Sequence, residues 1–182
     1  MPDLARAWRF LEQSDLVCGE HEVQGAIARV AAQIEARLRD SYPLVLVVMG
    51  GAVVFAGQLL PRLRFPLDLD YVHATRYGPQ TTGGGLTWRV SPPQEARDRT
   101  VLLLDDILDH GQTLWAIRDQ LRAQGAAQVL CAVLVEKTLP APKPIEADFV
   151  GLQIPDRFVF GCGMDAKGYW RNLPEIRAMR GS

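Results

Sequence analysis

The fold of this chain is decided by the stretch Val101-Leu102-Leu103-Leu104-Asp105-Asp106-Ile107-Leu108-Asp109-His110-Gly111-Gln112-Thr113-Leu114. Its four leading apolar residues predict the end of a buried strand, and two acids follow where that strand should emerge. A turn containing Asp109, Gly111 and Thr113 then opens a helix. Backbone N–H groups at a helix start can hold a phosphate, while the acids suit hydroxyl groups or a metal ion. The stretch therefore predicts an anion-binding strand-to-helix loop.

Length and composition indicate one folded domain of a soluble protein. The chain has 182 residues, of which 48% are apolar and 23% are charged, and its formal net charge is −1. That charge gives no general attraction to nucleic acid or to anionic lipid, so any recognition of phosphate must be local. The three cysteines are odd in number and form no C-x-x-C pair, which favours reduced thiols. Without a signal-peptide pattern or a membrane-length apolar run, we expect a cytoplasmic protein.

The residues before the decisive stretch predict two helices and a first strand-turn-helix unit. Leu4–Gln13 and His21–Arg39 have apolar residues every three or four positions, as amphipathic helices do. Leu44–Met49 is a continuous apolar run typical of a strand that is covered on both faces. Gly50 and Gly51 follow it and lead into an apolar helix over residues 52–60. Paired glycines let a backbone approach a ligand closely, although an ordinary tight turn explains them equally well.

The next segment predicts a strand and then a long loop. Leu67–Val72 alternates as a strand does and puts Asp68 and Asp70 on one face, which we expect to be solvated. The chain from Ala74 to Arg99 is rich in Gly and Pro and has no apolar periodicity, a pattern that favours a mobile lid. A short strand is expected within it at Leu86–Val90.

After the decisive stretch, the chain predicts another helix-strand pair. Thr113–Gln124 is a predicted helix, and Val129–Val135 is a buried strand that delivers Glu136 and Lys137 at its end. Three prolines between positions 140 and 144 predict a linker to a terminal segment, with a short strand at Phe149–Leu152.

This alternation of strands and helices predicts an α/β fold with a central parallel sheet. Ligands of such sheets bind outside the carboxyl ends of the strands. The polar and glycine positions that fall at those ends are Gly50, Asp105, Asp106, Asp109 and Lys137. Together they predict a site for a phosphorylated sugar, with magnesium as the cation. The P-loop, dinucleotide-binding and zinc-ligand motifs are absent, which argues against those classes.

At this point the residues can be compared with a known family. The run Val101–Leu114 resembles the phosphoribosyl-diphosphate (PRPP) signature of type I phosphoribosyltransferases, and later segments look like the hypoxanthine-guanine branch. Those later segments are Lys137, Asp148-Phe149-Val150-Gly151, Ile154-Pro155-Asp156-Arg157-Phe158-Val159, Asp165 and Tyr169-Trp170-Arg171-Asn172-Leu173-Pro174. The resemblance covers roughly residues 47–174. It implies a single domain over residues 1–182: a sheet core flanked by helices at about 41–139, a small hood from about 1–20 and 140–182, and a flexible lid loop at about 74–100.

The resemblance also implies an activity. Hypoxanthine or guanine would displace diphosphate from PRPP to give IMP or GMP in purine salvage, with Mg²⁺ as cofactor, in a homodimer or homotetramer. One alternative is a PRPP-sensing regulator of the same fold that binds RNA or DNA, and another is a xanthine-preferring phosphoribosyltransferase. The near-neutral charge and the lack of a Lys/Arg cluster argue against the regulator. We therefore expect small-molecule substrates and no nucleic-acid or membrane partner.

Residue roles follow from the resemblance, position by position. Asp109 would be the general base at the purine ring. The ribose and metal side would use Asp105 and Asp106, with Asp165 as a third metal-associated acid. The 5′-phosphate loop would comprise Asp109, His110, Gly111, Gln112 and Thr113. The diphosphate would be bound by Met49, Gly50, Gly51 and Arg171. The purine would contact Ile107, Lys137, Phe158, Val159 and Asp165. The lid would carry Arg76 and Tyr77.

Two of these roles have a clear chemical reason. The Lys137 ammonium would donate to the 6-oxo group and so disfavour adenine, whose amino group is a second donor. Phe158 would stack on the base, although a Phe-Val pair by itself is better explained as the core of a terminal hairpin.

Three positions depart from the family pattern. Met49 stands where many relatives have Lys or Arg, in a loop that family members bend through a non-proline cis peptide. His110 replaces a usual Thr or Ser, and Arg76 precedes Tyr77 where Ser is usual. The departures at Met49 and Arg76 concern diphosphate contacts, and the departure at His110 concerns the phosphate loop.

Overall fold

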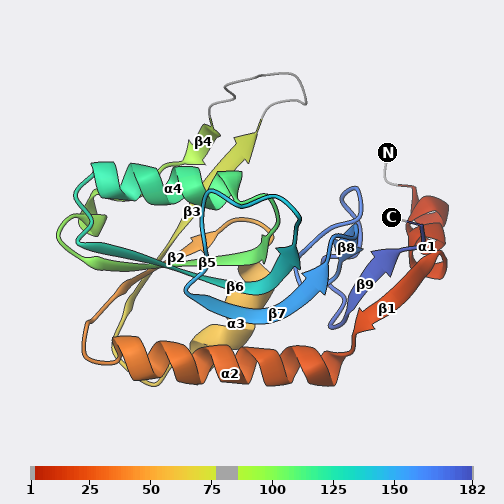
Figure 1. Ribbon diagram of the computed structural model, residues 1–182, viewed down its shortest axis with the longest axis horizontal. Coiled ribbons are helices and arrows are strands. Elements are labelled where there is room, and N and C mark those ends of the chain that lie inside the picture. The colour runs from red at the N-terminus through yellow and green to blue at the C-terminus, as the bar shows by residue number, and fades with distance from the viewer. Residues whose placement is uncertain (1–2, 77–85, 182) are drawn as a thin grey trace.

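Two sheets organise residues 3–76 and 86–181, which the computed structural model of the chain describes (Figure 1). The helices are α1 (Leu4–Glu12), α2 (Glu20–Leu38), α3 (Val53–Leu59) and α4 (Gln112–Ala123), with short 3-10 turns η1 (Leu60–Arg62) and η2 (Gln94–Ala96). The strands are β1 (Ser14–Cys18), β2 (Leu44–Val48), β3 (Asp68–Arg76), β4 (Leu86–Val90), β5 (Thr100–Leu108), β6 (Gln128–Thr138), β7 (Phe149–Pro155), β8 (Val159–Phe160) and β9 (Ile176–Met179). Over the described residues, none of the helices has the length and apolar character needed to cross a bilayer.

The larger sheet has six strands in the order β4-β3-β2-β5-β6-β7. Strands β3, β2, β5, β6 and β7 run parallel, as predicted, but the edge strand β4 pairs antiparallel with β3. The sheet is therefore mixed. Only nine residues separate the end of β3 from the start of β4. A link of that length suits antiparallel neighbours, whereas a parallel pair needs a longer crossover.

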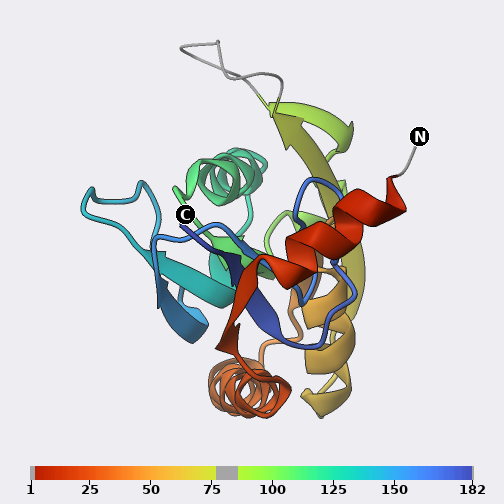
Figure 2. The ribbon, with the colours of Figure 1, turned by 90° about the vertical axis from the view of Figure 1, so that its right-hand side faces the viewer.

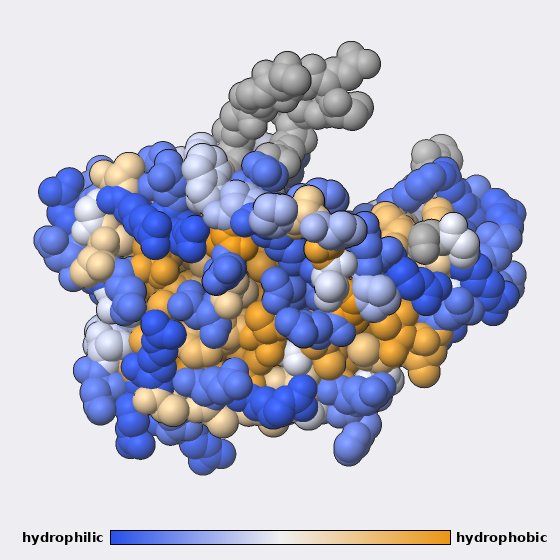
Figure 3. Space-filling model, viewed as in Figure 1, coloured by the Kyte–Doolittle hydropathy of each residue, from blue (hydrophilic) through white to orange (hydrophobic). Residues whose placement is uncertain are grey.

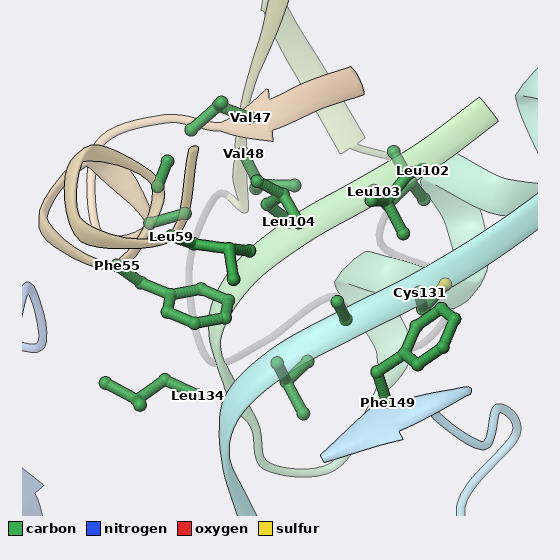
Figure 4. Packing of buried hydrophobic residues seen from close by; sticks show 14 of the residues in the cluster. Val47, Val48, Phe55, Leu59, Leu102, Leu103, Leu104, Cys131, Leu134 and Phe149 are labelled. Carbon is green, nitrogen blue, oxygen red and sulfur yellow. The ribbon is translucent and has the colours of Figure 1, made fainter. Parts of the chain in front are cut away.

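Helices cover both faces of the larger sheet. In Figure 2, α2 and α4 are seen nearly end-on at opposite sides of it. Figure 4 shows Phe55 and Leu59 of α3 pointing toward Leu104 of β5, and Phe149 of β7 lying beside Cys131 of β6. All five residues of β2 are buried, which explains its unbroken apolar run.

Strand β3 is exposed on both faces near its start. The acids at 68 and 70 were expected on a solvated face, and the Asp68 side chain is 46% exposed while it accepts a hydrogen bond from Arg99 at 2.7 Å. On the opposite face, Leu69 and Tyr71 are exposed as well, at 56% and 45%. Val72, on the same face as the acids, is fully buried.

The smaller sheet has the order β1-β9-β8 and joins the two ends of the chain. Helix α1 lies beside it, because Trp8 meets Trp170 edge-on at 5.1 Å and the Trp170 indole N–H donates to the Ala7 carbonyl at 2.6 Å. Figure 3 shows the outline dipping between this smaller lobe and the main body, with apolar residues gathered over β6 and β7. The prediction that everything after residue 140 belongs to the hood is wrong for β7.

Strand β7 lies in the larger sheet because it pairs parallel with β6, from Ala132 opposite Phe149 to Thr138 opposite Pro155. The proline-rich segment is thus a connection within the core and not a linker to a separate piece. The predicted lid is only partly described: Tyr77 and the rest of 77–85 lie outside the described residues. On either side, β3 runs on to Arg76, and β4 confirms the strand predicted at Leu86–Val90.

Candidate active site

The carboxyl ends of β2, β5 and β6 bring together the residues that were expected to meet there. Two adjoining cavities open at this edge, with volumes of about 380 Å³ and about 180 Å³. The larger is lined by Val48, Met49, Gly51, Asp105 to Leu114 and Arg171. The smaller is lined by Asp106, Ile107, Asp109, Lys137, Phe158, Val159, Met164 and Asp165. Asp106, Ile107 and Asp109 line both, so the two cavities meet at the end of β5.

The loop that begins α4 forms one wall of the larger cavity. Gly111 is the N-cap and has a left-handed backbone with φ of 78°, and the helix starts one residue earlier than predicted, at Gln112. No side chain caps the helix start, so its first N–H groups are available to an anion. A Cβ at position 111 would lie 2.9 Å from Ile145, so a glycine is needed there for space as well as for backbone conformation.

The two acids lie inside a strand and not beyond its end. The sequence predicted that the strand stops near Leu104, but β5 continues to Leu108 because β6 pairs with it up to Glu136. Asp105 and Asp106 are consequently buried, each 9% exposed. Burial, reinforced by the negative charge of Asp106, raises the pKa of Asp105 well above its ordinary value. Burial also raises the pKa of Asp106, against the charge of Arg171 and the hydrogen bond from Asp105.

Asp109 and Lys137 form an ion pair where the cavities meet. The Lys137 ammonium donates to Asp109 Oδ2 at 3.1 Å and to Asp156 Oδ1 at 3.3 Å. Asp109 Oδ1 is shielded from solvent and accepts no hydrogen bond from the described residues. His110 Nδ1 lies 3.1 Å from this oxygen without hydrogen-bond geometry. Asp109 Oδ2 is thus held in place by Lys137, while Oδ1 remains able to accept a hydrogen bond.

The turn after β2 is packed against a loop from the smaller lobe. The Met49–Gly50 peptide is cis, and a side chain at Gly51 would collide with the Asp106 carboxylate. A side chain at Gly163 would likewise collide with the Gly51 carbonyl. The loop bearing Gly163 also carries Arg171, which donates to the Gly163 carbonyl at 2.6 Å and pairs with Asp165 at 2.5 Å. Arg171 therefore reaches the larger cavity from the opposite lobe.

Comparison with known proteins agrees with this geometry. A family model described as phosphoribosyl transferase domain matches residues 20–167. The chain belongs to the phosphoribosyltransferase family. The hypoxanthine-guanine phosphoribosyltransferase of Bacillus subtilis is 30% identical over 168 residues, which cover 91% of this chain and 92% of that protein. The hypoxanthine-guanine-xanthine phosphoribosyltransferase of Tritrichomonas foetus is 28% identical, with 90% of each chain covered.

A solved structure agrees as well. The hypoxanthine-guanine phosphoribosyltransferase of Bacillus anthracis has a TM-score of 0.82 and 27% identity, and the match covers 90% of this chain and 95% of that one. The type I phosphoribosyltransferase fold expected from the sequence is confirmed, and these relatives put the chain in the hypoxanthine-guanine branch of the family.

The acid pair of this phosphoribosyltransferase fits a magnesium ion. Asp105 and Asp106 offer hard carboxylate oxygens, and their raised pKa values mean that a cation beside them would be favourable. Asp165 lines the smaller cavity with Asp106 but is paired with Arg171. No three potential ligand side chains within the described residues are grouped to hold an ion, so the remaining ligands would come from substrate and water, as Mg²⁺ prefers.

Sequence reasoning missed some residues at this phosphoribosyltransferase site. Asp156 holds the Lys137 ammonium, and Met164 lines the smaller cavity. Asp156 stood in a segment that was compared with the family, but its contact with Lys137 joins residues 19 positions apart. A count of the donors on a buried lysine would have called for such an acceptor. Of the predicted purine contacts, Val159 is buried, whereas Phe158 also lines the smaller cavity but is 43% exposed.

We predict that Asp105→Asn stabilises the ligand-free protein at neutral pH. The folded chain holds this proton to a higher pH than the unfolded chain does, so its contribution to stability falls as the pH rises from about 3.8 toward the raised pKa. Replacing the carboxylate should increase the free energy of unfolding by about 1 to 3 kcal/mol at pH 7. The gain should vanish near pH 4.

Urea denaturation at both pH values measures this difference. Asp40→Asn, at a side chain that is 94% exposed, is the matched control and should leave the stability unchanged at either pH. Equal stability of wild type and Asp105→Asn at pH 7 would show that burial of this carboxylate carries no cost.

Proposed function

We propose that this phosphoribosyltransferase converts hypoxanthine and guanine with PRPP into IMP and GMP, releasing diphosphate. The observation that carries the proposal is the meeting of the two cavities at Asp109. One cavity has the unused N–H groups of a helix start, which suit a phosphate. The other is lined by a buried ammonium and a partly exposed aromatic ring, which suit a purine with an oxo group.

Recognition of the 6-oxo group follows from the donors of Lys137. An ammonium has three N–H donors, and two of them are used on Asp109 and Asp156. The third has no acceptor among the described residues and is available to a carbonyl oxygen in the smaller cavity. Because an ammonium has no acceptor to offer, the amino group of adenine would leave this buried donor unpaired.

Asp109 would remove the ring proton of the base. As a purine ring nitrogen bonds to C1′ of the ribose, the C1′–oxygen bond to diphosphate breaks and the ring N–H loses its proton. Asp109 Oδ1 is the acceptor with no hydrogen bond from the described residues, and Lys137 fixes the other oxygen of the same carboxylate. Geometry of this kind suits a general base, because Asp109 lines both cavities and its carboxylate is already oriented.

The remaining roles concern PRPP. The 5′-phosphate would lie at residues 109–113, the ribose hydroxyls at Asp105 and Asp106, and the diphosphate between the Met49–Gly51 turn and Arg171. All of these residues except Gly50 line the larger cavity. Mg²⁺ held by the acid pair would neutralise charge on the departing diphosphate. Met49 is uncharged, so the cation for the diphosphate would be Arg171, which lines the same cavity among the described residues.

The experiment is an assay with PRPP, Mg²⁺ and each of hypoxanthine, guanine, xanthine and adenine, on wild type and Asp109→Asn. Wild type should turn over hypoxanthine and guanine, and no turnover of either would refute the proposal. Asp109→Asn should reduce kcat by about 10² to 10⁴-fold, because general-base catalysis is lost, while PRPP still binds. Asp119→Asn, on the exposed side of α4, is the matched control and should retain the wild-type rate. A wild-type rate in Asp109→Asn would remove Asp109 from the role of base.

The same proposal includes a cytoplasmic homodimer or homotetramer. The three cysteines are free and buried, which suits a reducing compartment. Leu69 and Tyr71 are exposed on one face of β3, and an exposed apolar pair of this kind suits a contact between copies of the chain. We predict that light scattering detects an oligomer and that Leu69→Lys shifts it to the monomer. A wild-type mass equal to one chain would contradict this.

A further inference from the structure

The connection between β6 and β7 contains a buried lysine that the proposed function does not use. Lys143 lies between two of the prolines of this connection, and only 10% of its side chain is exposed. It lines neither of the two cavities at Asp109. It therefore has no direct contact with the space where substrates would react.

All three N–H donors of the Lys143 ammonium have acceptors. The ammonium donates to the Lys137 carbonyl at 2.5 Å, to Glu136 Oε1 at 3.1 Å and to the Leu108 carbonyl at 3.2 Å. Glu136 is itself only 22% exposed, so the ion pair is largely shielded from solvent. An ammonium with every donor used has one well-defined position.

The two backbone acceptors belong to the strand ends that carry the chemistry. Leu108 is the last residue of β5, and Asp109 follows it directly. The second carbonyl is that of Lys137 itself. Leu108 and Glu136 are also the last register pair between β5 and β6, so Lys143 links the two strands at the point where their pairing ends. One ammonium thus holds the backbone of both partners in the Asp109–Lys137 ion pair.

The same connection also supports the phosphate loop. Ile145 is 2% exposed, and its Cγ2 is the nearest atom to the Cβ position of Gly111, with Pro144 close by. The residues that follow Lys143 therefore pack under the N-cap of α4. The prolines on both sides limit the backbone freedom of this segment. The segment from Lys143 to Ile145 therefore contacts both the ends of β5 and β6 and the loop that begins α4.

We propose that Lys143 is a positioning residue, which sets the distance between the base Asp109 and the purine donor Lys137 by holding the backbone of each strand end. The proposal rests on the proposed function, since it names what fixes the geometry of that site. Methionine at position 143 would keep the length of the side chain but leave two carbonyls and Glu136 without this donor. The ends of β5 and β6 would then lose this link beyond their last register pair, Leu108 and Glu136.

The test is steady-state kinetics of Lys143→Met and Lys143→Arg beside wild type. Lys143→Met should lower kcat about 10- to 100-fold and raise the KM for hypoxanthine, because small misplacements of catalytic groups are costly. The KM for PRPP should change less than about threefold, since the phosphate-binding N–H groups of α4 remain. Lys143→Arg, which keeps the charge and the donors, should recover part of the lost kcat.

A matched control separates positioning from general stability. Arg99 is another partly buried cation, 24% exposed, that donates to an acid and a carbonyl, Asp68 Oδ2 at 2.7 Å and the Tyr42 carbonyl at 3.1 Å. It precedes the opposite end of β5, away from the cavities. Arg99→Met should lower the melting temperature without changing kcat or either KM. A Lys143→Met enzyme that behaves like Arg99→Met would reduce Lys143 to a structural role and overturn the proposal.

Crystal structures of the variants test the inference even if the protein shows no enzymatic turnover. The contact between Lys137 Nζ and Asp109 Oδ2, 3.1 Å in the wild type, should be lost in ligand-free Lys143→Met. Its retention would overturn the inference. If Lys143→Met does not fold, Lys143→Gln, which keeps two of the three N–H donors but not the charge, serves for the same measurement. A wild type that turns over no oxopurine would refute the proposed function, and the crystallographic comparison would still decide the role of Lys143.

Discussion

The parallel pairing of β5 with β2 on one side and β6 on the other is the constraint on which the site depends. Parallel strands place their carboxyl ends at one edge, so residues more than eighty positions apart, from Gly51 to Lys137, come to the same place. The turn into α4 then brings the unused N–H groups of a helix start to that edge. No single loop could assemble an acid pair, an ammonium and an anion site from local sequence. The sheet does this because each strand contributes its own end.

Much of this arrangement was predictable because its signals are local. The apolar periodicity of α2 and α4 and the unbroken apolar run of β2 depend on neighbouring residues alone, and their predicted bounds agree with the structure to within one or two residues. The alternation of strands and helices then made a parallel sheet the expected outcome. Gly111 was expected at the start of a helix, and its left-handed backbone is what a residue with a side chain would rarely adopt.

The features that were not predictable depend on partners far away in the sequence. Asp105 and Asp106 are buried because β6 continues beside them, and nothing next to the acids indicates that the ladder continues. Leu69 and Tyr71 are exposed although they form the apolar face of β3, which the alternation along β3 does not reveal. The contacts of Asp156 and Lys143 with strand ends likewise join separate segments. The proline-rich segment at residues 140–144 was predicted to be a linker because the residues against which it packs are distant in the sequence.

The central claim is that phosphate and purine occupy two cavities that meet at Asp109. A crystal structure of the protein with guanosine 5′-monophosphate tests it most directly. The account predicts the phosphate at the N-terminus of α4, the 6-oxo group within hydrogen-bond distance of Lys137 Nζ, and a ring nitrogen facing the Asp109 carboxylate. A nucleotide bound with its base outside the smaller cavity, or with its phosphate away from residues 109–113, would contradict the account.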